Sequence, residues 1–457
     1  MSTTENMPVA LGGTPARNWQ FRTTPEVGEV DMDFCKACID SREWEPGSGE
    51  GGLPLGSRWV GPMPRIDKSV LAAFGPEVAM FGAEFGAVHA PLQSLHRVVP
   101  MNNGTHAIRV ALQALSLHAK SLGFRVPHTD GDEVIVPALT WQATAGAVFA
   151  RGLVPILVDV LPGTLCIDPA AIEAAITPST VAIIVVHLYN RMAEMAAIRA
   201  IAAKHDLAVI EDCAHAQGAE YMGRAAGTED CLMSTSSFQS SKVLSGGGEG
   251  GAVITRRRVL IDRVASLVSG RPIGGLRPLP AANDRMPVIV AALLRGQLRR
   301  LPEQTATCRT TFAALDRGTV ALPGITAMDA QPDVTRYPHY KWAFRVDKAE
   351  WPHLSVPQLE RLLAQELRCE VVPPYEPLTD SSVYTPLSDP MFWAVEGYGQ
   401  RIDPRRFNAP QATTAYQTVL ALEHAVGLDP EFPGAFTEAV WKLHRNQVKL
   451  GRALSSS

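Results

Sequence analysis

The middle of the chain alternates between apolar strand-like runs and helix-like stretches, and this pattern constrains the fold more than any other. The strand-like runs lie at 132–137, 154–160, 181–189 and 207–212, and the helix-like stretches lie at 140–151, 169–176 and 193–205. Continuous Val/Ile runs are typical of strands buried on both faces, and strands separated by helices predict a mainly parallel sheet with right-handed crossovers. We therefore expect an α/β fold built on such a sheet, flanked by helices.

The pattern divides the chain into three expected parts. Residues 1–100 are rich in Gly and Pro, and we expect them to wrap around the main body. Residues 101–260 form the expected large domain. It closes with a strand at 251–255, which follows the preceding glycines too closely for a helical crossover and is therefore antiparallel to its neighbour or distant from the strand before it. Residues 261–457 form the expected smaller α+β domain, with helices at 288–301 and 411–425 and strands near 341–346 and 369–372.

Charge and cysteine content argue against several classes of partner. Lys and Arg number 42 against 46 Asp and Glu, a net charge of −4, so we expect neither nucleic acid nor an anionic membrane as a partner. The chain start lacks a signal-peptide pattern, and no apolar run reaches the roughly 20 residues of a membrane span. Seven cysteines make an odd count, which favours reduced thiols and a cytoplasmic location. Cys35 and Cys38 form a lone C-x-x-C, which we interpret as two helix positions and not as a redox or zinc site.

One lysine stands between a run of hydroxyl side chains and a run of glycines. Residues 234–251 read S-T-S-S-F-Q-S-S-K-V-L-S-G-G-G-E-G-G, with Lys242 at the K. Hydroxyls and glycine N–H groups hold a phosphate closely, and a partly desolvated lysine beside it can form a Schiff base with the aldehyde of pyridoxal phosphate. A Ser/Gly surface loop with a solvated lysine is the alternative. The glycines also satisfy G-x-G-x-x-G, but a strand follows them, so we reject a dinucleotide site.

Other polar or aromatic residues follow the predicted strands, where ligands bind in sheets of this kind. Asp212 ends an apolar strand, and a carboxylate there is costly unless it meets a cation such as a protonated pyridine nitrogen. His215, three residues on, is within reach of the same ring, and Trp141 follows another strand and is suited to stack on it. The alternatives are a helix cap for Asp212, a packed surface histidine and a core tryptophan. Thr105 stands near the start of a helix, where free N–H groups attract anions.

These residues lie in motifs that resemble the sugar and cyclitol aminotransferases of the DegT/DnrJ/EryC1/StrS family. The motifs are N-G-T at 103–105, G-D-E-V-I-V-P-A-L-T-W from 131, V-H-L-Y at 186–189, V-I-E-D-C-A-H-A-Q-G-A-E-Y from 209, S-F-x-x-x-K at 237–242, G-E-G-G at 248–251 and P-P-Y-E-P-L at 373–378. The resemblance implies a fold-type-I pyridoxal-phosphate-dependent transferase. The T-W-Q-A-T and S-S-K-V-L forms are most similar to the branch that aminates scyllo-inosose and 2-deoxy-scyllo-inosose with L-glutamine in aminoglycoside biosynthesis.

The resemblance also implies roles for individual residues. Lys242 is the implied Schiff-base lysine and proton shuttle, Asp212 pairs with the pyridine nitrogen, and His215 lies near the ring hydroxyl. The implied phosphate ligands are Gly104, Thr105 and Ser237, with Trp141 over the ring. Asn283, in A-A-N-D-R-M, is the implied phosphate ligand from a partner subunit, which means a homodimer with shared sites. We expect no metal.

The chain departs from the family pattern where the second substrate is expected. An extra glycine separates Lys242 from G-E-G-G, the 270–283 segment is shortened, Asp284 replaces an aromatic residue, and N-R-M follows V-H-L-Y. We expect amino transfer from an amino acid, L-glutamine, to a keto cyclitol or keto sugar. Alternatives are a related enzyme that forms an aminobenzoate from a dehydroshikimate-like ring and a non-catalytic ligand-binding regulator. Lys242 argues against the dehydratase relatives, which carry histidine there.

Overall fold

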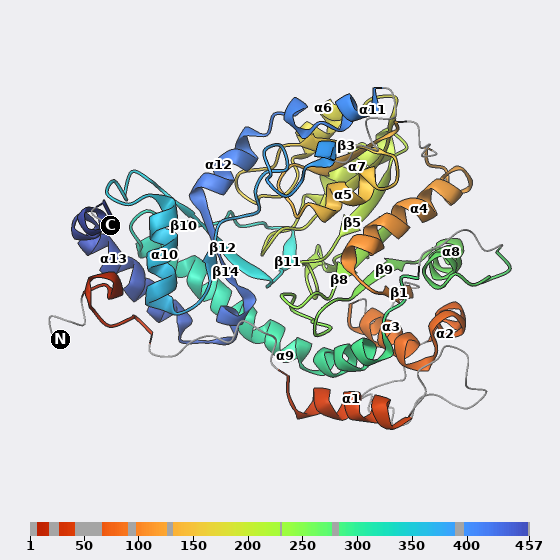
Figure 1. Cartoon of the computed structure of the whole chain (residues 1–457), viewed down its shortest axis with the longest axis horizontal. Helices are drawn as coiled ribbons and strands as arrows, with labels where there is room; N and C mark the ends of the chain where they lie inside the picture. The colour runs from red at the N-terminus through yellow and green to blue at the C-terminus, as the bar shows by residue number, and fades with distance from the viewer. Residues whose placement is uncertain are drawn as a thin grey trace.

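The chain forms an elongated molecule with a large sheet in one half and a smaller sheet in the other. The computed structural model describes residues 7–17, 27–41, 66–89, 97–125, 131–228, 231–276, 283–388 and 397–455. Figure 1 shows the two halves side by side, with the long helix α9 running beneath both of them.

The larger half is built on a seven-stranded sheet whose strands are almost entirely buried. The strand order is β1 (Arg97–Met101), β9 (Gly251–Thr255), β8 (Met233–Ser237), β5 (Ala208–Asp212), β4 (Thr180–Val186), β2 (Glu133–Pro137) and β3 (Val154–Val158). Neighbouring strands pair in parallel from β8 through to β3, whereas β9 pairs antiparallel with both β8 and β1. The predicted mainly parallel sheet is confirmed, and so is the antiparallel direction of β9. Strand β1 was not predicted.

Helices cover this sheet and join its strands. They are α2 (Lys68–Phe74), α3 (Pro76–His89), α4 (Gly104–Leu122), α5 (Ala143–Phe149), α6 (Pro169–Ala175), α7 (Met195–Lys204) and α8 (Arg258–Ser269). Helix α4 begins where the Asn103 side chain accepts a hydrogen bond from the His106 N–H at 2.8 Å, and it ends at Gly123 in the left-handed conformation. It packs against β8, β9, α5 and α8, so its first turn is held near the carboxyl end of β8.

The smaller half contains a four-stranded antiparallel sheet with its own core. Its strand order is β10 (Ile325–Ala327), β12 (Lys341–Val346), β14 (Val419–Glu423) and β13 (Val371–Val372). Helices α10 (Val356–Leu367) and α13 (Phe432–Ser455) pack beside it, around buried aromatic residues that include Trp342, Phe344 and Phe436. The prediction of one helix near 411–425 is partly wrong. Helix α12 (Pro410–Thr418) stops where the apolar V-L-A-L-E segment becomes β14, which pairs with β12 and β13.

Helix α9 (Val288–Gly318) extends well beyond the predicted 288–301 and continues through Pro302. Helix α1 (Glu29–Ser41) packs on it, and Cys35 and Cys38 lie in α1, as predicted. A three-stranded sheet joins β6 (Glu220–Tyr221) and β7 (Arg224–Ala225), which lie between β5 and β8 in the chain, to β11 (Val334–Arg336), which lies between β10 and β12. The remaining short elements are η1 (Val9–Leu11), η2 (Thr319–Ala321), η3 (Pro386–Ser388), α11 (Tyr398–Ile402), η5 (Pro404–Arg406) and η6 (His424–Leu428).

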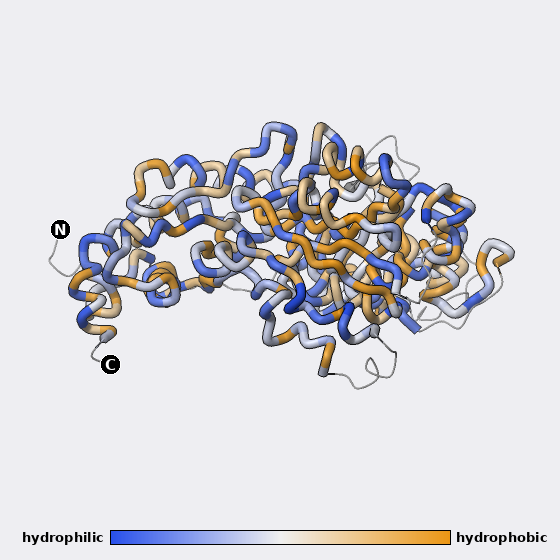
Figure 2. Tube along the Cα trace, turned by 90° about the horizontal axis from the view of Figure 1, so that it is seen from above, coloured by the Kyte–Doolittle hydropathy of each residue, from blue (hydrophilic) through white to orange (hydrophobic). Residues whose placement is uncertain are grey.

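Apolar segments gather in the interior of the larger half, as the hydropathy colouring in Figure 2 shows. Helices with the length and apolar character of a membrane span are absent from the described part of the chain. The division at residues 100 and 260 stays a prediction.

Candidate active site

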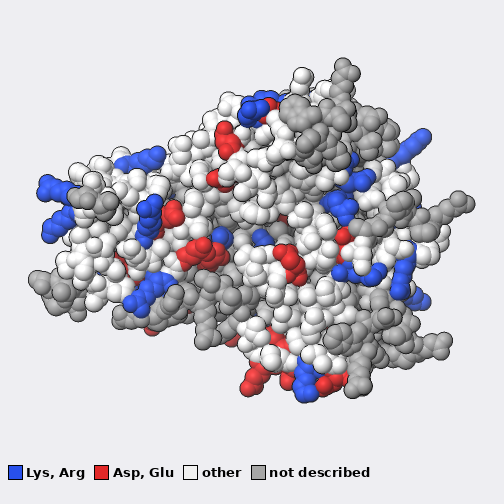
Figure 3. Space-filling model, in the orientation of Figure 1, with Lys and Arg blue, Asp and Glu red and all other residues white. Residues whose placement is uncertain are grey.

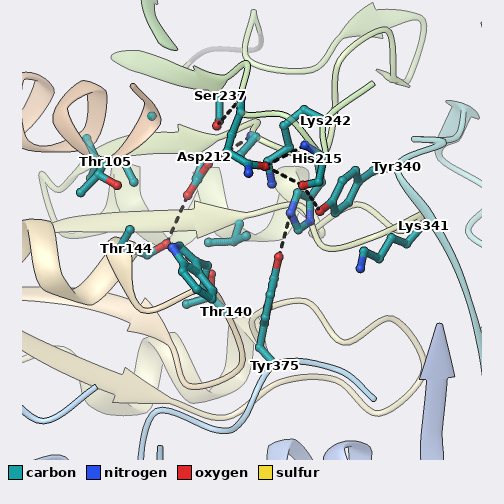
Figure 4. A pocket seen from close by; sticks show the side chains of 18 of the residues that line it. Thr105, Thr140, Thr144, Asp212, His215, Ser237, Lys242, Tyr340, Lys341 and Tyr375 are labelled. Carbon is teal, nitrogen blue, oxygen red and sulfur yellow. Dashed lines mark hydrogen bonds between the residues drawn. The ribbon is translucent and has the colours of Figure 1, made fainter. Parts of the chain in front are cut away.

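A cavity of about 400 Å³ opens at the carboxyl ends of β5 and β8. Its walls come from the first turn of α4, the loop after β2, the segments after β5 and β8, and the start of β12. Of the eight residues expected in the site, seven line this cavity: Gly104, Thr105, Trp141, Asp212, His215, Ser237 and Lys242. Figure 4 shows the side chains of Thr105, Asp212, His215, Ser237 and Lys242 converging from separate elements.

Asp212 is a buried carboxylate at the end of β5. Its Oδ2 accepts a hydrogen bond from the Thr144 hydroxyl at 3.2 Å, and its Oδ1 accepts one from the Ala214 N–H at 3.1 Å. Burial raises the pKa of Asp212 above its usual value, while the Ala214 N–H and the charge of Lys242 oppose that rise. A carboxylate placed in this way is stabilised by a bound cation. The helix-cap alternative fits less well, because a short turn and not a helix follows Asp212.

Lys242 lies in the loop after β8 and is only 9 % exposed, which rules out the solvated surface lysine. Its ammonium lies 4.4 Å from the centroid of the Tyr340 ring. The Tyr340 hydroxyl and the Ser241 hydroxyl are 3.1 Å apart, which ties the ring to the lysine loop. The lysine is therefore held against an aromatic face at the edge of the cavity.

His215 is buried in a cluster of tyrosines. Its Nδ1 accepts a hydrogen bond from the Tyr189 N–H at 3.3 Å, so the proton of the neutral ring is on Nε2, which lies 3.3 Å from the Tyr375 hydroxyl. The ring stacks on Tyr340 with centroids 4.0 Å apart. Burial, together with the charges of Lys242 and Lys341, lowers the pKa of His215 well below its usual value. A neutral histidine is the result, and both its nitrogens contact protein groups.

The start of α4 and the end of β8 approach each other closely at one side of the cavity. A Cβ on Gly104 would lie 2.8 Å from the Ser237 Cβ, and a Cβ on Gly251 would collide with the Asn103 carbonyl. Thr105 is exposed and stands at the first turn of α4. The first N–H groups of a helix have no partner within the helix. Beside the Thr105 and Ser237 hydroxyls, they form a suitable binding site for a phosphate.

Trp141 stands at the mouth of the cavity and is 50 % exposed. Its ring lies 5.6 Å from that of Tyr375, at an interplanar angle of 57°. The core alternative for Trp141 is therefore wrong, and half of its surface stays accessible.

Asn283 does not line the cavity. It is exposed, and the following residue, Asp284, is buried. The Asp284 carboxylate pairs with Arg109 at 2.6 Å and His106 at 2.8 Å, and its carbonyl accepts the Asn102 N–H. Asp284, one of the departures from the family pattern, thus anchors its segment beside the start of α4.

Several lining residues were not identified from the sequence. Lys341 is the first residue of β12 in the second sheet, Tyr340 directly precedes it, and Thr144 comes from α5. Tyr375 lies within the P-P-Y-E-P-L motif, but no role was assigned to it. The Lys341 ammonium contacts the Glu423 carboxylate on β14 at 2.6 Å.

The arrangement combines a buried carboxylate, a buried lysine, an anion-binding helix start and an exposed aromatic ring in one cavity. This set suits a planar cationic ring that carries a phosphate, with an amine positioned to transfer protons. Figure 3 shows basic and acidic side chains interspersed over one face of the molecule, without a continuous basic field among the residues coloured there.

Known proteins resemble this chain over most of its length. The sequence profile of the DegT/DnrJ/EryC1/StrS aminotransferase family matches residues 64–392. An L-glutamine:2-deoxy-scyllo-inosose aminotransferase of Micromonospora echinospora is 37 % identical over 92 % of this chain and 93 % of its own, and that of Streptomyces lividus is 38 % identical over 76 % and 82 %. The crystal structure of 3-amino-5-hydroxybenzoic acid synthase superposes with a TM-score of 0.71 at 25 % identity, covering 97 % of this chain and 100 % of the other.

Proposed function

The chain belongs to the DegT/DnrJ/EryC1/StrS aminotransferase family, and we propose that it uses pyridoxal 5'-phosphate to move an amino group from L-glutamine to a keto cyclitol. The observation that carries the proposal is the presence of a buried carboxylate, Asp212, and a buried lysine, Lys242, in one cavity beside a helix start. Neither charge is stable there without a partner of opposite charge or a covalent use.

The residues present fit the cofactor. Because Gly104 has no Cβ, the first turn of α4 approaches Ser237 closely, and the N–H groups of that turn, with the Thr105 and Ser237 hydroxyls, are the proposed phosphate ligands. Asp212 is the proposed partner of the pyridine nitrogen, because its pKa is raised by burial and a ring cation offsets that cost. Trp141 is the proposed ring cover. His215 is proposed to lie along the ring edge, where it remains neutral and ordered by Tyr375.

The reaction needs a base that removes a proton from one carbon and returns it to another. We assign this role to Nζ of Lys242, since general acid–base catalysis of this kind is worth about 10²–10⁴-fold. Pyridoxal phosphate, when bound, supplies the electron sink that makes the carbon acidic. Tyr340 and Ser241 hold the lysine loop, and Asp212 keeps the ring positively charged so that it withdraws electrons.

The substrates are inferred from the relatives. Two relatives at 37 % and 38 % identity are named for L-glutamine and 2-deoxy-scyllo-inosose, whereas 3-amino-5-hydroxybenzoic acid synthase is 25 % identical. Hydroxyl and amide side chains on the cavity wall, among them Thr140, Gln239 and Ser241, suit a neutral polyhydroxylated ring. These observations favour the cyclitol acceptor over the aromatic one.

We further propose that Asn283 completes the phosphate-binding site of a partner subunit in a homodimer. Asn283 is exposed, and the next residue, Asp284, is anchored beside α4 by Arg109. Asn283 is therefore available to a second copy of the chain. An Asn283→Ala variant tests this point: we expect weaker cofactor binding with unchanged dimer mass in analytical ultracentrifugation.

The function is tested with the purified, cofactor-loaded protein in two steps. L-Glutamine should weaken the visible absorption band of the lysine-bound cofactor and produce the absorption band of its amine form. Subsequent addition of 2-deoxy-scyllo-inosose should restore the first band and yield an aminated cyclitol by mass spectrometry. An unchanged spectrum with L-glutamine, at a confirmed cofactor occupancy, would sink the proposed donor, and restoration by a dehydroshikimate-like ring alone would favour the aminobenzoate alternative.

A further inference from the structure

The cavity wall carries a second lysine that the proposed chemistry does not use. Lys341 and Lys242 are the cationic side chains among the described residues that line the cavity. They lie against the same aromatic ring, with their nitrogens 5.7 Å and 4.4 Å from the Tyr340 centroid. In Figure 4 the amine of Lys341 is turned toward the side of the cavity where Tyr375 stands.

The Lys341 ammonium is held in place but not saturated. It contacts one carboxylate oxygen of Glu423 at 2.6 Å, and both side chains are nearly buried, at 12 % and 13 % exposure. An ammonium group has three donors, so two of its hydrogens remain for other acceptors. Because Glu423 pairs with Lys341 across neighbouring strands β12 and β14, the lysine is fixed in direction before any ligand arrives.

The two proposed substrates differ in charge, and the Lys341–Glu423 ion pair can distinguish between them. An amino-acid donor carries a carboxylate next to its amine, whereas the cyclitol acceptor is neutral. The amine must reach the position next to Lys242, which brings the carboxylate into the same small cavity. A carboxylate taken out of water needs a cation and hydrogen bonds.

We propose that Lys341 binds the α-carboxylate of the amino-acid donor and that Glu423 neutralises the lysine when the uncharged acceptor occupies the cavity. The inference rests on the proposed function, since it concerns the donor of that reaction. One site thereby accepts an anionic and a neutral substrate in turn, because the lysine always has one carboxylate partner.

The test uses two probes that cannot react because they lack an amine. Glutaramate is L-glutamine without its amino group, and glutaramide is the same molecule with its carboxylate replaced by an amide. We expect calorimetry on the cofactor-loaded wild type to give at least about tenfold tighter binding of glutaramate than of glutaramide. Lys341→Met should abolish that preference, and Lys341→Arg should retain most of it.

A matched control separates recognition from a general effect of losing a lysine. Lys204 contacts Glu173 at the same 2.6 Å but is exposed and does not line the cavity, so Lys204→Met should keep the full preference. A wild type without preference for glutaramate, or Lys341→Met with the preference intact, overturns the inference. If the probes bind too weakly for calorimetry, the KM of L-glutamine replaces them: Lys341→Met should raise it about tenfold or more while the acceptor KM stays within about twofold. Equal changes in both KM values overturn the inference.

The failure of this inference is distinguishable from that of the proposed function. A wild type that does not convert with L-glutamine refutes the donor assignment itself. Conversion in the wild type, with equal affinity for L-glutamine in Lys341→Met, refutes only the role of Lys341.

Discussion

Lys242 and Tyr340, which lie 98 positions apart in the sequence, meet with the lysine nitrogen 4.4 Å from the centroid of the tyrosine ring. The same ring stacks on His215. One tyrosine that directly precedes a strand of the smaller sheet therefore orders two side chains, Lys242 and His215, that follow strands of the larger sheet. The active-site cavity is therefore a joint product of both halves of the molecule.

Tyr340→Leu should destabilise the cofactor-free protein more than Tyr340→Phe does. Phenylalanine keeps the ring and loses the hydroxyl contacts with Ser241 and Tyr375, each worth about 1 kcal/mol. Leucine also removes the cation–π contact, worth about 0.5–2 kcal/mol, and the stack on His215. Thermal and urea unfolding measure the difference; equal stability of the two variants would show that the ring contacts contribute nothing.

Asp212→Asn should lower the rate of conversion by L-glutamine by about 100-fold or more, because the amide is nearly isosteric but removes the negative charge. Stopped-flow absorbance on the cofactor-loaded variant measures the rate, and circular dichroism checks the fold. Asp403→Asn is the control, since Asp403 caps a short helical turn and does not line the cavity. A rate within about threefold of the wild type for Asp212→Asn would contradict the role of the carboxylate.

Gly251→Ala should disrupt the phosphate-binding site at the start of α4, whereas Gly248→Ala, in the loop just before β9, should be tolerated. A Cβ at position 251 would collide with the Asn103 carbonyl, but a Cβ at position 248 meets nothing within 4 Å. Overpacking of this kind costs about 1–3 kcal/mol. Urea unfolding and the dissociation constant of pyridoxal phosphate should both change for Gly251→Ala, and similar values for the two variants would refute the close approach.

Acid should destabilise the protein partly through His424. Burial lowers the pKa of His424 to about 4, and the charge of Lys341 is a further cause. In the unfolded chain the pKa of a histidine is about 6.5. Between these values the unfolded chain binds more protons, so the free energy of unfolding falls as the pH drops, by up to about 1.4 kcal/mol per pH unit for this residue. His424→Gln should reduce the slope of stability against pH by about one proton. An unchanged slope would contradict a neutral buried His424.

The sequence predicted the large sheet well, because its strands are continuous Val/Ile runs and burial on both faces leaves a strong signal. It predicted β14 wrongly, since V-L-A-L-E is short enough to extend a helix pattern, and only pairing with β12 and β13 makes it a strand. Helix α13 was not predicted, although its buried residues Phe436, Val440, Leu443 and Leu450 recur at helical spacing.

The candidate site was predicted where its residues follow the strands of the large sheet. Seven of the eight expected residues line the cavity, because the carboxyl ends of parallel strands meet at one edge. Tyr340 and Lys341 were missed because they lie where the chain enters β12 of the other sheet, and the sequence does not reveal which distant segments fold against each other. Asn283 concerns a second copy, so its role stays a prediction.

The most direct test of the account is to identify the lysine that holds pyridoxal phosphate. The protein is loaded with the cofactor, reduced with borohydride and digested, and the peptides are sequenced by mass spectrometry. We predict a pyridoxyl group on Lys242, lost in Lys242→Ala. A pyridoxyl group on Lys341, which lines the same cavity, or on no lysine at all would contradict the account.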